Sequence, residues 1–311
     1  MRTDPFEVSL LARLATPLTR QMMNGATMGT RYAAVFFAPA ECDLKAVARE
    51  LKQVVDVVDA QMSTWKLESD LMRLNRAPVG RWVAMPEPLL MVLEAAIEIG
   101  RLSGGAFDIG VGDAVSAWGF GSSRGRRDAE AMARAKDAPR PPAHLGLELD
   151  VVSGRIRKLA EMTLDLSGIA KGFGVDELAR VLISHGIAHF LVSIDGEVRA
   201  TGGKPDGTPW RVAVESPTPG ERQAEGVIEL FSGAVATSGD YRHFVEIDGK
   251  RYSHTIDPRT GAPLVGGAAA VTVRAESCMA ADAWATALLV MGPERGTEAA
   301  AAQGIEALFM A

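Results

Sequence analysis

The chain has 311 residues, which is the length of one large domain or of two ordinary ones. Hydrophobic residues make up 47% of it and charged residues 23%, so the chain can bury a core and is not disordered throughout. The formal net charge is −6, and no basic block or aromatic-basic interleaving occurs, which disfavours a nucleic-acid partner.

The cysteines and the apolar runs exclude further classes of protein. Cys42 and Cys278 share no motif, so we expect two buried thiols rather than a disulfide framework or a zinc site. No apolar run approaches the roughly 20 residues of a membrane-spanning helix. The run Val8–Leu14 contains Arg13, is short for a signal peptide and is followed by no cleavage site. We therefore expect a soluble protein without a membrane span, cytoplasmic as the sequence stands.

Residues 1–24 are expected to form an N-terminal extension with a turn or two of amphipathic helix. Apolar residues at helical spacing, capping residues such as Asp43, and alanine-rich composition predict helices over 44–61, 86–103, 175–185, 277–291 and 294–303. Alternating apolar residues predict strands over 32–37, 188–194, 197–201, 210–215, 268–274 and 305–310, and hairpins over 145–159 and over 227–231 with 234–237. Residues 122–143 are charged and proline-rich, which predicts an exposed excursion. Hairpins mixed with helices, without regular βαβ alternation, predict an α+β fold with mixed or antiparallel sheets.

The stretch from Ala236 to Leu264 is the most informative part of the chain. It is expected to form two strands, 244–248 and 251–256, joined by a turn at Asp248-Gly249, and a second turn over 257–261. It holds more hydrogen-bonding side chains than two turns need, which is typical of a functional site. These side chains are Ser238, Asp240, Arg242, His243, His254, Asp257 and Arg259.

Two further patterns suit a charged ligand. Asp282 and Thr286 are four residues apart on an expected helix, so they share one face, and their oxygens suit Mg²⁺. Taken alone, such a pair is more often a polar stripe on an exposed helix. Asp165, Gly168 and Lys171 lie in a strand–turn–helix that favours anions, although a helix cap with a solvated lysine explains them equally well.

Other candidates are weak when taken singly. The glycine-rich run Gly104–Asp108 can cradle a flat ring with its aromatic residue and carboxylate, although such runs usually only turn. Trp65 and Trp118 are more often core or rim residues than ring-stacking ones. His254 is a natural proton carrier near neutral pH, whereas a lone strand histidine is more often structural. No Gly-x-Ser-x-Gly elbow or Cys/His signature supports acyl transfer.

Taken together and in order, the motifs resemble those of the FAD:protein FMN transferase family, the ApbE-like flavin transferases. The resemblance runs from about Asn24 to the C-terminus. It implies an ApbE-like (T-fold-like) architecture in which residues 25–311 form one catalytic unit, or two subdomains with the FAD site between them. The motifs that carry it are Met28-Gly29-Thr30, Ser63-Thr64-Trp65, Gly104–Asp108, Leu164–Gly172, Ala236–Phe244, Tyr252–Leu264, and Ala281-Asp282 with Ala285-Thr286.

The resemblance implies an enzyme with FAD as its substrate and Mg²⁺ as its cofactor. In the family, a threonine or serine hydroxyl of an acceptor flavoprotein, of a redox or electron-transport type, attacks the phosphorus of FMN, and AMP leaves. Some relatives instead hydrolyse FAD to FMN and AMP. An FAD pyrophosphatase and a non-catalytic flavin-binding protein are therefore alternatives, and the presence of Asp282 and Thr286 disfavours the second of these.

The resemblance also implies roles for particular residues. The Gly168 carbonyl, the Asp282 carboxylate and the Thr286 hydroxyl correspond to the metal ligands. His254 and Asp282 correspond to candidates for accepting the threonine proton, and the sequence does not decide between them. Contacts to FAD are implied for Met28, Trp65, Ala106, Phe107, Asp108, Asp165, Lys171, His254 and Ile256.

The sequence departs from the family pattern within the expected site. Asp195-Gly196-Glu197 stands where the family commonly has Gly-Gly-Glu, and an added carboxylate near a pyrophosphate would weaken binding unless it faces away or meets the metal. Ile109–Asp113 stands where the family often has Pro-Thr-Val-Gly-Pro. Gly168 replaces a common alanine, a change that a backbone ligand tolerates. Many relatives are exported lipoproteins, and this chain has no lipid-accepting cysteine near its start, so the sequence does not decide its compartment.

Overall fold

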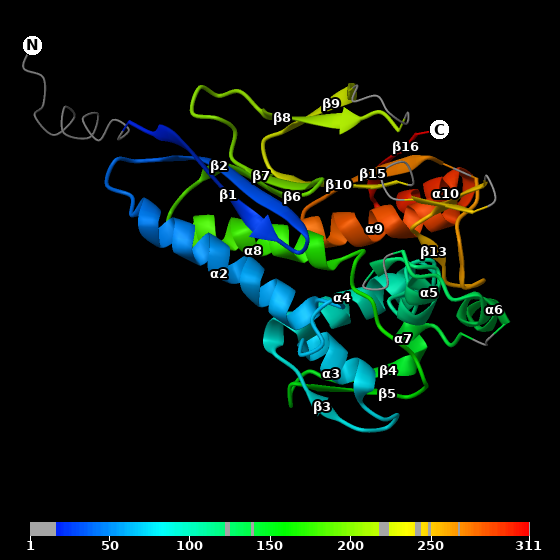
Figure 1. Ribbon diagram of the computed structural model, residues 1–311. Helices are drawn as coiled ribbons and strands as arrows, with labels where there is room; N and C mark the ends of the chain where they lie inside the picture. Colours follow the sequence, from blue (N-terminus) through cyan, green and yellow to red (C-terminus); the bar gives the residue numbers. More distant parts are fainter. Residues whose placement is uncertain are drawn as a thin grey trace, which may run out of the picture.

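The computed structural model describes residues 17–121, 125–137, 140–217, 224–239, 244–247, 250–266 and 268–310. A seven-stranded antiparallel sheet forms one layer, and long helices cover one of its faces (Figure 1). In sheet order the strands are β1 (Thr19–Thr27), β2 (Thr30–Ala38), β6 (His189–Ile194), β7 (Glu197–Thr201), β10 (Gly233–Gly239), β15 (Ala270–Ala275) and β16 (Glu306–Met310). This sheet and its helices confirm the predicted α+β fold.

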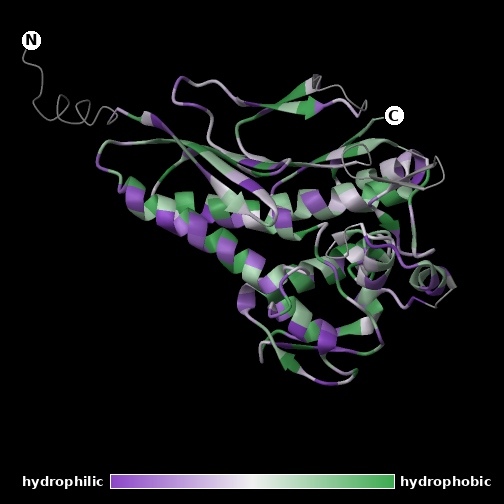
Figure 2. Ribbon diagram, viewed as in Figure 1, coloured by the Kyte–Doolittle hydropathy of each residue, from purple (hydrophilic) through white to green (hydrophobic). Residues whose placement is uncertain are grey.

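The helices on this face are α2 (Leu44–Met62), α8 (Ala170–Ser184), α9 (Cys278–Met291) and α10 (Pro293–Gln303). Alternate residues of β2, namely Tyr32, Ala34 and Phe36, are buried in the core, as the pleat of a strand requires. Helix α2 carries hydrophilic and hydrophobic residues on different sides (Figure 2). The predicted cap of α2 is confirmed, because the Asp43 side chain accepts two backbone N–H groups of the first turn.

A second layer lies beneath these helices and contains a small sheet (Figure 1). Its central helix, α4 (Glu87–Leu102), buries Leu89 and Leu93 completely. The predicted hairpin at 145–159 is confirmed as β4 (Leu147–Asp150) paired with β5 (Arg155–Lys158). The other elements are α3 (Asp70–Arg76), β3 (Val83–Ala84), α5 (Gly112–Ala117), α6 (Ala129–Asp137) and α7 (Ala143–Gly146).

Short ribbons complete the fold. Their strands are β8 (Trp210–Glu215) with β9 (Ala224–Leu230), β11 (Phe244–Ile247) with β12 (Lys250–Ser253), and β13 (Ile256–Asp257) with β14 (Ala262–Pro263). The hairpin predicted within the polar stretch is thus confirmed as β11 and β12, while its Asp248-Gly249 turn lies outside the described residues. The second predicted turn is closed by a 2.9 Å hydrogen bond from the Gly261 N–H to the Asp257 carbonyl.

The predicted pairing of 227–231 with 234–237 is wrong. Strands β9 and β10 do not pair with each other, because β9 pairs with β8 and β10 lies between β7 and β15. Gly233, with φ of 113°, allows the chain to leave the ribbon and enter the sheet at this point. Strand β1 begins at Thr19, within the residues assigned to the N-terminal extension, and every one of its residues pairs with β2. Residues 1–16 of that extension lie outside the described residues.

The exposed excursion predicted over 122–143 contains helix α6 and is fastened to the second turn of the polar stretch. The indole N–H of Trp118 donates to the Gly261 carbonyl at 3.0 Å. A Cβ atom at Gly261 would lie 2.0 Å from the carbonyl oxygen of Ala135, so only glycine permits this approach. Ile256 and Tyr252 pack in the same apolar cluster as Trp118 and Ala135.

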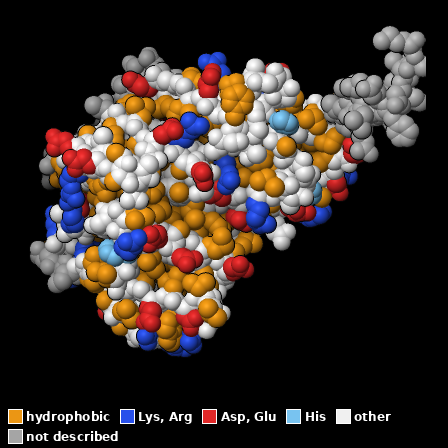
Figure 3. Space-filling model, turned by 180° about the vertical axis from the view of Figure 1, so that it is seen from behind, with side chains coloured by type: hydrophobic (Ala, Val, Ile, Leu, Met, Phe, Trp, Pro, Cys, Tyr) orange, Lys and Arg blue, Asp and Glu red, His pale blue; other side chains and the backbone are white. Residues whose placement is uncertain are grey.

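The surface has mixed charge. On the face shown in Figure 3, Lys and Arg side chains are interspersed with Asp and Glu side chains, and hydrophobic side chains gather between them. Within the described ranges, no helix combines the length and the apolar composition needed to cross a bilayer.

Helices α8 and α9 approach each other closely at Gly172. A Cβ atom there would lie 2.4 Å from the carbonyl oxygen of Cys278 and 2.8 Å from Cβ of Asp282. The Gly172 N–H donates to Oδ2 of Asp282 at 3.0 Å. Glycine at this position therefore sets the spacing of the two helices and the place of the Asp282 carboxylate.

We expect Gly172→Ala to lower the free energy of unfolding by about 1–3 kcal/mol, the usual cost of overpacking, because the Cys278 carbonyl cannot move without displacing α9. Gly174→Ala in the same helix is the control, since its Cβ would meet side chains rather than backbone, and the closest contacts are the ends of Ile194 and Met28 at 2.9 and 3.1 Å. Urea denaturation of both variants measures the difference. Equal losses in the two variants would contradict this account of the helix spacing.

Candidate active site

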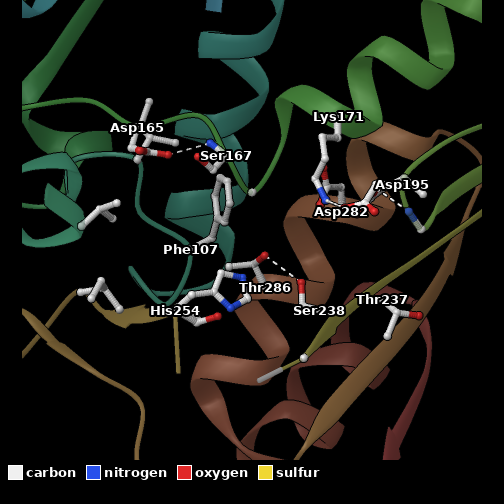
Figure 4. A pocket seen from close by; sticks show the side chains of 18 of the residues that line it. Phe107, Asp165, Ser167, Lys171, Asp195, Thr237, Ser238, His254, Asp282 and Thr286 are labelled. Carbon is white, nitrogen blue, oxygen red and sulfur yellow. Dashed lines mark hydrogen bonds and ion pairs between the residues drawn. The ribbon is translucent and has the colours of Figure 1, made fainter. Parts of the chain in front are cut away.

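A cavity of about 350 Å³ is walled by the main sheet, by helices α8 and α9, and by loops of the second layer (Figure 4). Its walls come from the loop after α4, the turn into α8, the β6–β7 turn, β8, β10, the segment after β12, and α9. The predicted site residues that line it are Ala106, Phe107, Asp108, Asp165, Gly168, Lys171, His254, Ile256, Asp282 and Thr286.

The structure brings the three predicted metal ligands to this cavity. Asp282 and Thr286 both line it from α9, so they share one face of the helix as predicted. Gly168 lies directly against Thr286, because a Cβ atom at Gly168 would be 3.2 Å from Thr286 Oγ1 and 3.3 Å from Phe107 Cε2. A carboxylate, a hydroxyl and a backbone segment from two distant parts of the chain therefore meet at one wall.

Asp282 is an unusual carboxylate because it is only 4% exposed. Burial and the carboxylate of Glu197 raise the pKa of Asp282 to about 7, against the opposing effects of Lys171 and the Gly172 N–H. Among the described residues, none donates a hydrogen bond to its second oxygen, Oδ1. A cation at this oxygen would stabilise the ionised form, so the residue suits a metal site.

The chemistry of this donor set fits Mg²⁺. In the described part of the chain, no three His, Cys, Asp or Glu side chains converge in a metal-binding group. Mg²⁺ does not require such a group, because it usually keeps several waters and binds through one or two carboxylates together with substrate phosphates. Asp282 with the Thr286 hydroxyl and the Gly168 carbonyl is a set of this kind.

Lys171 is held by carboxylates of the β6–β7 turn. Its Nζ lies 2.7 Å from Oε1 of Glu197. Oδ2 of Asp195 is 3.6 Å from the same nitrogen, and Figure 4 shows Lys171 and Asp195 close together. Burial lowers the pKa of Lys171, but the carboxylates of Glu197, Asp282 and Asp195 outweigh burial and raise this pKa above its ordinary value. The side chain of Glu197 is 3% exposed, and such a buried carboxylate needs a partner of opposite charge. Lys171 therefore serves first as the counter-charge of Glu197.

The carboxylates of Asp108 and Asp165 shape the loops that carry them. Oδ1 of Asp108 accepts the Gly110 N–H at 2.7 Å, and Oδ2 accepts the Ala143 N–H at 3.1 Å. Burial raises the pKa of Asp108 despite these hydrogen bonds. Oδ1 of Asp165 accepts the Ser167 N–H at 2.8 Å, which fixes the turn leading into α8 (Figure 4). Both residues line the cavity, but part of their hydrogen-bonding capacity is used by the protein itself.

One side of the cavity is apolar. Phe107 is 3% exposed to solvent, and Val111, Val115 and Ile256 line the cavity with it. Side chains of this kind suit a flat aromatic ring such as that of a flavin. Ile256 is held there by its packing against the cluster around Trp118.

Met28 and Trp65 do not line this cavity. Met28 lies in the β1–β2 turn with φ of 44°, and its side chain packs toward Gly174 of α8. Trp65 follows α2 and is 60% exposed. Its neighbour Thr64 lines a smaller cavity of about 50 Å³, which shares Val115 and Asp165 with the large one.

Two parts of the polar stretch identified from the sequence reach the cavity. Ser238 of β10 lines it, and the Ser238 and Thr286 hydroxyls are 3.0 Å apart (Figure 4). His254, which follows β12, also lines the cavity and is partly buried. Asp240, Arg242 and His243 lie outside the described residues.

Sequence reasoning missed one wall of the cavity. Val212, Ala213 and Glu215 of β8 line it, as does Val115 of α5. Strand β8 carries only an ordinary alternation of apolar and polar residues, so no sequence signal marked it. Its place in the ribbon above the sheet brings it to the site (Figure 1).

Comparison with known proteins places the chain in a family. The family model described as the ApbE family matches residues 28–309. The chain belongs to the ApbE family. It is 40% identical to the FAD:protein FMN transferase of Vibrio cholerae, over 97% of this chain and 90% of that relative. It is 34% identical to the FAD:protein FMN transferase of Escherichia coli K12, over 95% of this chain and 84% of that relative.

Solved structures of ApbE proteins have the same fold. The flavin transferase ApbE from Vibrio cholerae superposes with a TM-score of 0.83 at 39% identity, and 94% of each chain is covered. The apo form of the Pseudomonas stutzeri flavinyl transferase ApbE superposes with a TM-score of 0.82 at 36% identity, covering 94% of this chain and 91% of that one. The predicted ApbE-like architecture is thereby confirmed.

We expect Lys171→Met to lower the free energy of unfolding by about 2–3 kcal/mol. This is less than the roughly 3–5 kcal/mol lost when a fully buried pair is broken, because the Lys171 side chain is 29% exposed. Adding Glu197→Gln to this variant should recover part of the loss, since it removes the charge left unpaired. Thermal and urea unfolding measure both effects, and a double variant no more stable than Lys171→Met would contradict the assigned pairing.

Proposed function

We propose that this protein transfers the FMN part of FAD to a threonine or serine hydroxyl of an acceptor flavoprotein, with Mg²⁺ bound and AMP released. The observation that carries the proposal is the meeting of Asp282, Thr286 and Gly168 at one wall of a cavity with an apolar side. Relatives named FAD:protein FMN transferase cover most of the chain at 34–40% identity, which supports the same reaction class. The acceptor is expected to be a subunit of a redox or electron-transport protein.

Binding and orientation are the main tasks of the protein in such a reaction, because phosphoryl-type transfer needs alignment and charge stabilisation more than covalent catalysis. Asp282, the Thr286 hydroxyl and the Gly168 carbonyl would hold the metal. Bound Mg²⁺ would offset negative charge on the pyrophosphate and on the departing AMP. Phe107 and its apolar neighbours would place the ring system, and the walls around them would exclude water.

His254 is the better candidate for the residue that accepts the proton of the acceptor hydroxyl. One oxygen of Asp282 is already engaged by the Gly172 N–H, and its carboxylate is assigned to the metal. His254 lines the same cavity, and an imidazole is suited to proton transfer near neutral pH. In this scheme the hydroxyl oxygen bonds to the phosphorus of FMN, its proton passes to His254, and the bond between that phosphorus and the AMP oxygen breaks.

Residues 25–311 are proposed to act as a single catalytic unit. The cavity is lined both by the layer of the main sheet and by loops of the second layer, so neither layer holds the site alone. The FAD site would then lie between them.

Transfer can be tested with the purified full chain, FAD, MgCl₂ and a flavoprotein subunit co-expressed as acceptor. A threonine of the acceptor that gains the mass of FMN in mass spectrometry, with equimolar AMP, supports transfer. An acceptor in which this threonine is changed to valine is the control. Release of AMP without any acceptor would show an FAD pyrophosphatase, and FAD retained without AMP would show a binding protein.

We expect Asp282→Ala to abolish turnover through loss of the metal, and Asp282→Asn to do nearly the same. The loss should exceed the roughly 10–100-fold that removal of an outer-shell partner of a metal ligand costs. Steady-state release of AMP measures it. Glu276→Ala, at an exposed position before α9, is the control. Full activity in the Asp282 variants would overturn the metal assignment.

For His254→Ala we expect transfer to slow by roughly 10²–10⁴-fold, the usual contribution of a general base, while FAD still binds. Single-turnover labelling of the acceptor and quenching of flavin fluorescence measure the two properties separately. A large loss of FAD affinity would instead make His254 a binding residue.

A further inference from the structure

The β6–β7 turn forms the part of the cavity wall next to Lys171. Ile194 pairs with Glu197, so the loop between the strands consists of Asp195 and Gly196. Asp195 has φ of 59°, in the left-handed region, and Asp-Gly is a favoured sequence for a tight turn of this kind. The backbone of Asp195 is therefore held by the hairpin, and its side chain is carried on a rigid support.

The Asp195 carboxylate meets Lys171. One lysine thus serves two carboxylates of the same turn, Glu197 at 2.7 Å and Asp195 at 3.6 Å. The two are not equivalent, because the side chain of Glu197 is 3% exposed and that of Asp195 is 35% exposed. Glu197 needs the lysine as a buried partner, whereas Asp195 adds a second negative charge on the open side of the pair.

The charge of the cavity wall decides what effect the Asp195 carboxylate has on a bound ligand. Among the described lining residues, Lys171 is the only lysine or arginine. The carboxylates that line the cavity are Asp108, Asp165, Asp195, Glu197, Glu215 and Asp282. The described residues of this wall thus carry an excess of negative charge, which opposes the doubly negative pyrophosphate of FAD unless a cation joins it.

We propose that Asp195 makes the binding of FAD depend on a divalent cation. Glu197 already balances the charge of Lys171, so the Asp195 carboxylate leaves this part of the wall with a net negative charge that repels the pyrophosphate. Asp195 acts on the bound FAD through the charge of the wall beside Lys171, so it is a positioning residue rather than a catalytic one. The inference rests on the proposed function, which supplies FAD as the ligand. This role explains the carboxylate at position 195, where the family commonly has glycine. The carboxylate neither faces away from the cavity nor needs to bind the metal.

The test compares FAD affinity in EDTA with FAD affinity in saturating MgCl₂, followed by quenching of flavin fluorescence in the full chain. Asp195→Asn removes the charge and keeps the turn, because Asn-Gly is equally favoured there. We expect this variant to bind FAD on the order of tenfold more tightly than the wild type in EDTA. In MgCl₂ the two should bind alike, because the ion already offsets the pyrophosphate charge.

Two further variants separate charge from structure. Asp195→Glu keeps the negative charge and should keep the strong dependence on MgCl₂. Asp206→Asn removes an equal charge from an exposed turn that does not line the cavity, and should leave both affinities unchanged.

Distinct results would overturn the inference. If Asp195→Asn has the same ratio of affinities in the two buffers as the wild type, or binds FAD more weakly in EDTA, Asp195 does not set the cation dependence. If the wild-type protein binds FAD in neither buffer, the proposed function fails and the inference fails with it. Wild-type binding that depends on MgCl₂, together with an unchanged ratio in Asp195→Asn, would overturn the inference alone.

Discussion

The close approach of α8 and α9 is the constraint on which the rest of the site depends. Because Gly172 has no side chain, α9 lies near enough for Asp282 to accept a hydrogen bond from the first turn of α8. The start of α9 is held to the same helix, since Asp176 accepts the N–H groups of Cys278 and Met279 at 2.9 Å each. A carboxylate at this end of a helix also meets its positive dipole. The position of the candidate metal wall is therefore decided by the close approach of two helix backbones, and the Asp282 and Asp176 carboxylates hold it through hydrogen bonds to backbone N–H groups.

A second theme is the excess of carboxylates over lysine and arginine among the described residues that line the cavity. Glu197 and Asp282 are both buried, and Lys171 is the lysine that both of them face. Burial of two carboxylates beside one lysine leaves negative charge uncompensated. Burial and, after it, the Glu197 carboxylate raise the pKa of Asp282, and a cation bound beside this residue would stabilise its ionised form. The electrostatics of the folded wall and its proposed ligand chemistry therefore have a common origin.

Local patterns carried most of what could be predicted from the sequence. The helix over 44–61 and its Asp43 cap, and the shared face of Asp282 and Thr286, depend on residues a few positions apart, and the structure confirms them. Strand pairing, in contrast, does not depend on residues a few positions apart. Strand β10 enters the sheet between partners that are distant in sequence, so adjacent strands were wrongly joined as a hairpin. The pairing of Lys171 with Glu197, and the wall supplied by β8, likewise arise only when the sheet forms.

The attachment of Gly261 to the second layer has a consequence for motion. The indole N–H of Trp118 donates a hydrogen bond to the Gly261 carbonyl, and the Ala135 carbonyl occupies the space that a side chain at Gly261 would need. The segment that carries His254 and Ile256 is thus coupled to α5 and α6. A displacement of this wall of the cavity would therefore also displace those helices, so the wall is built from two linked chain segments rather than from a single loop.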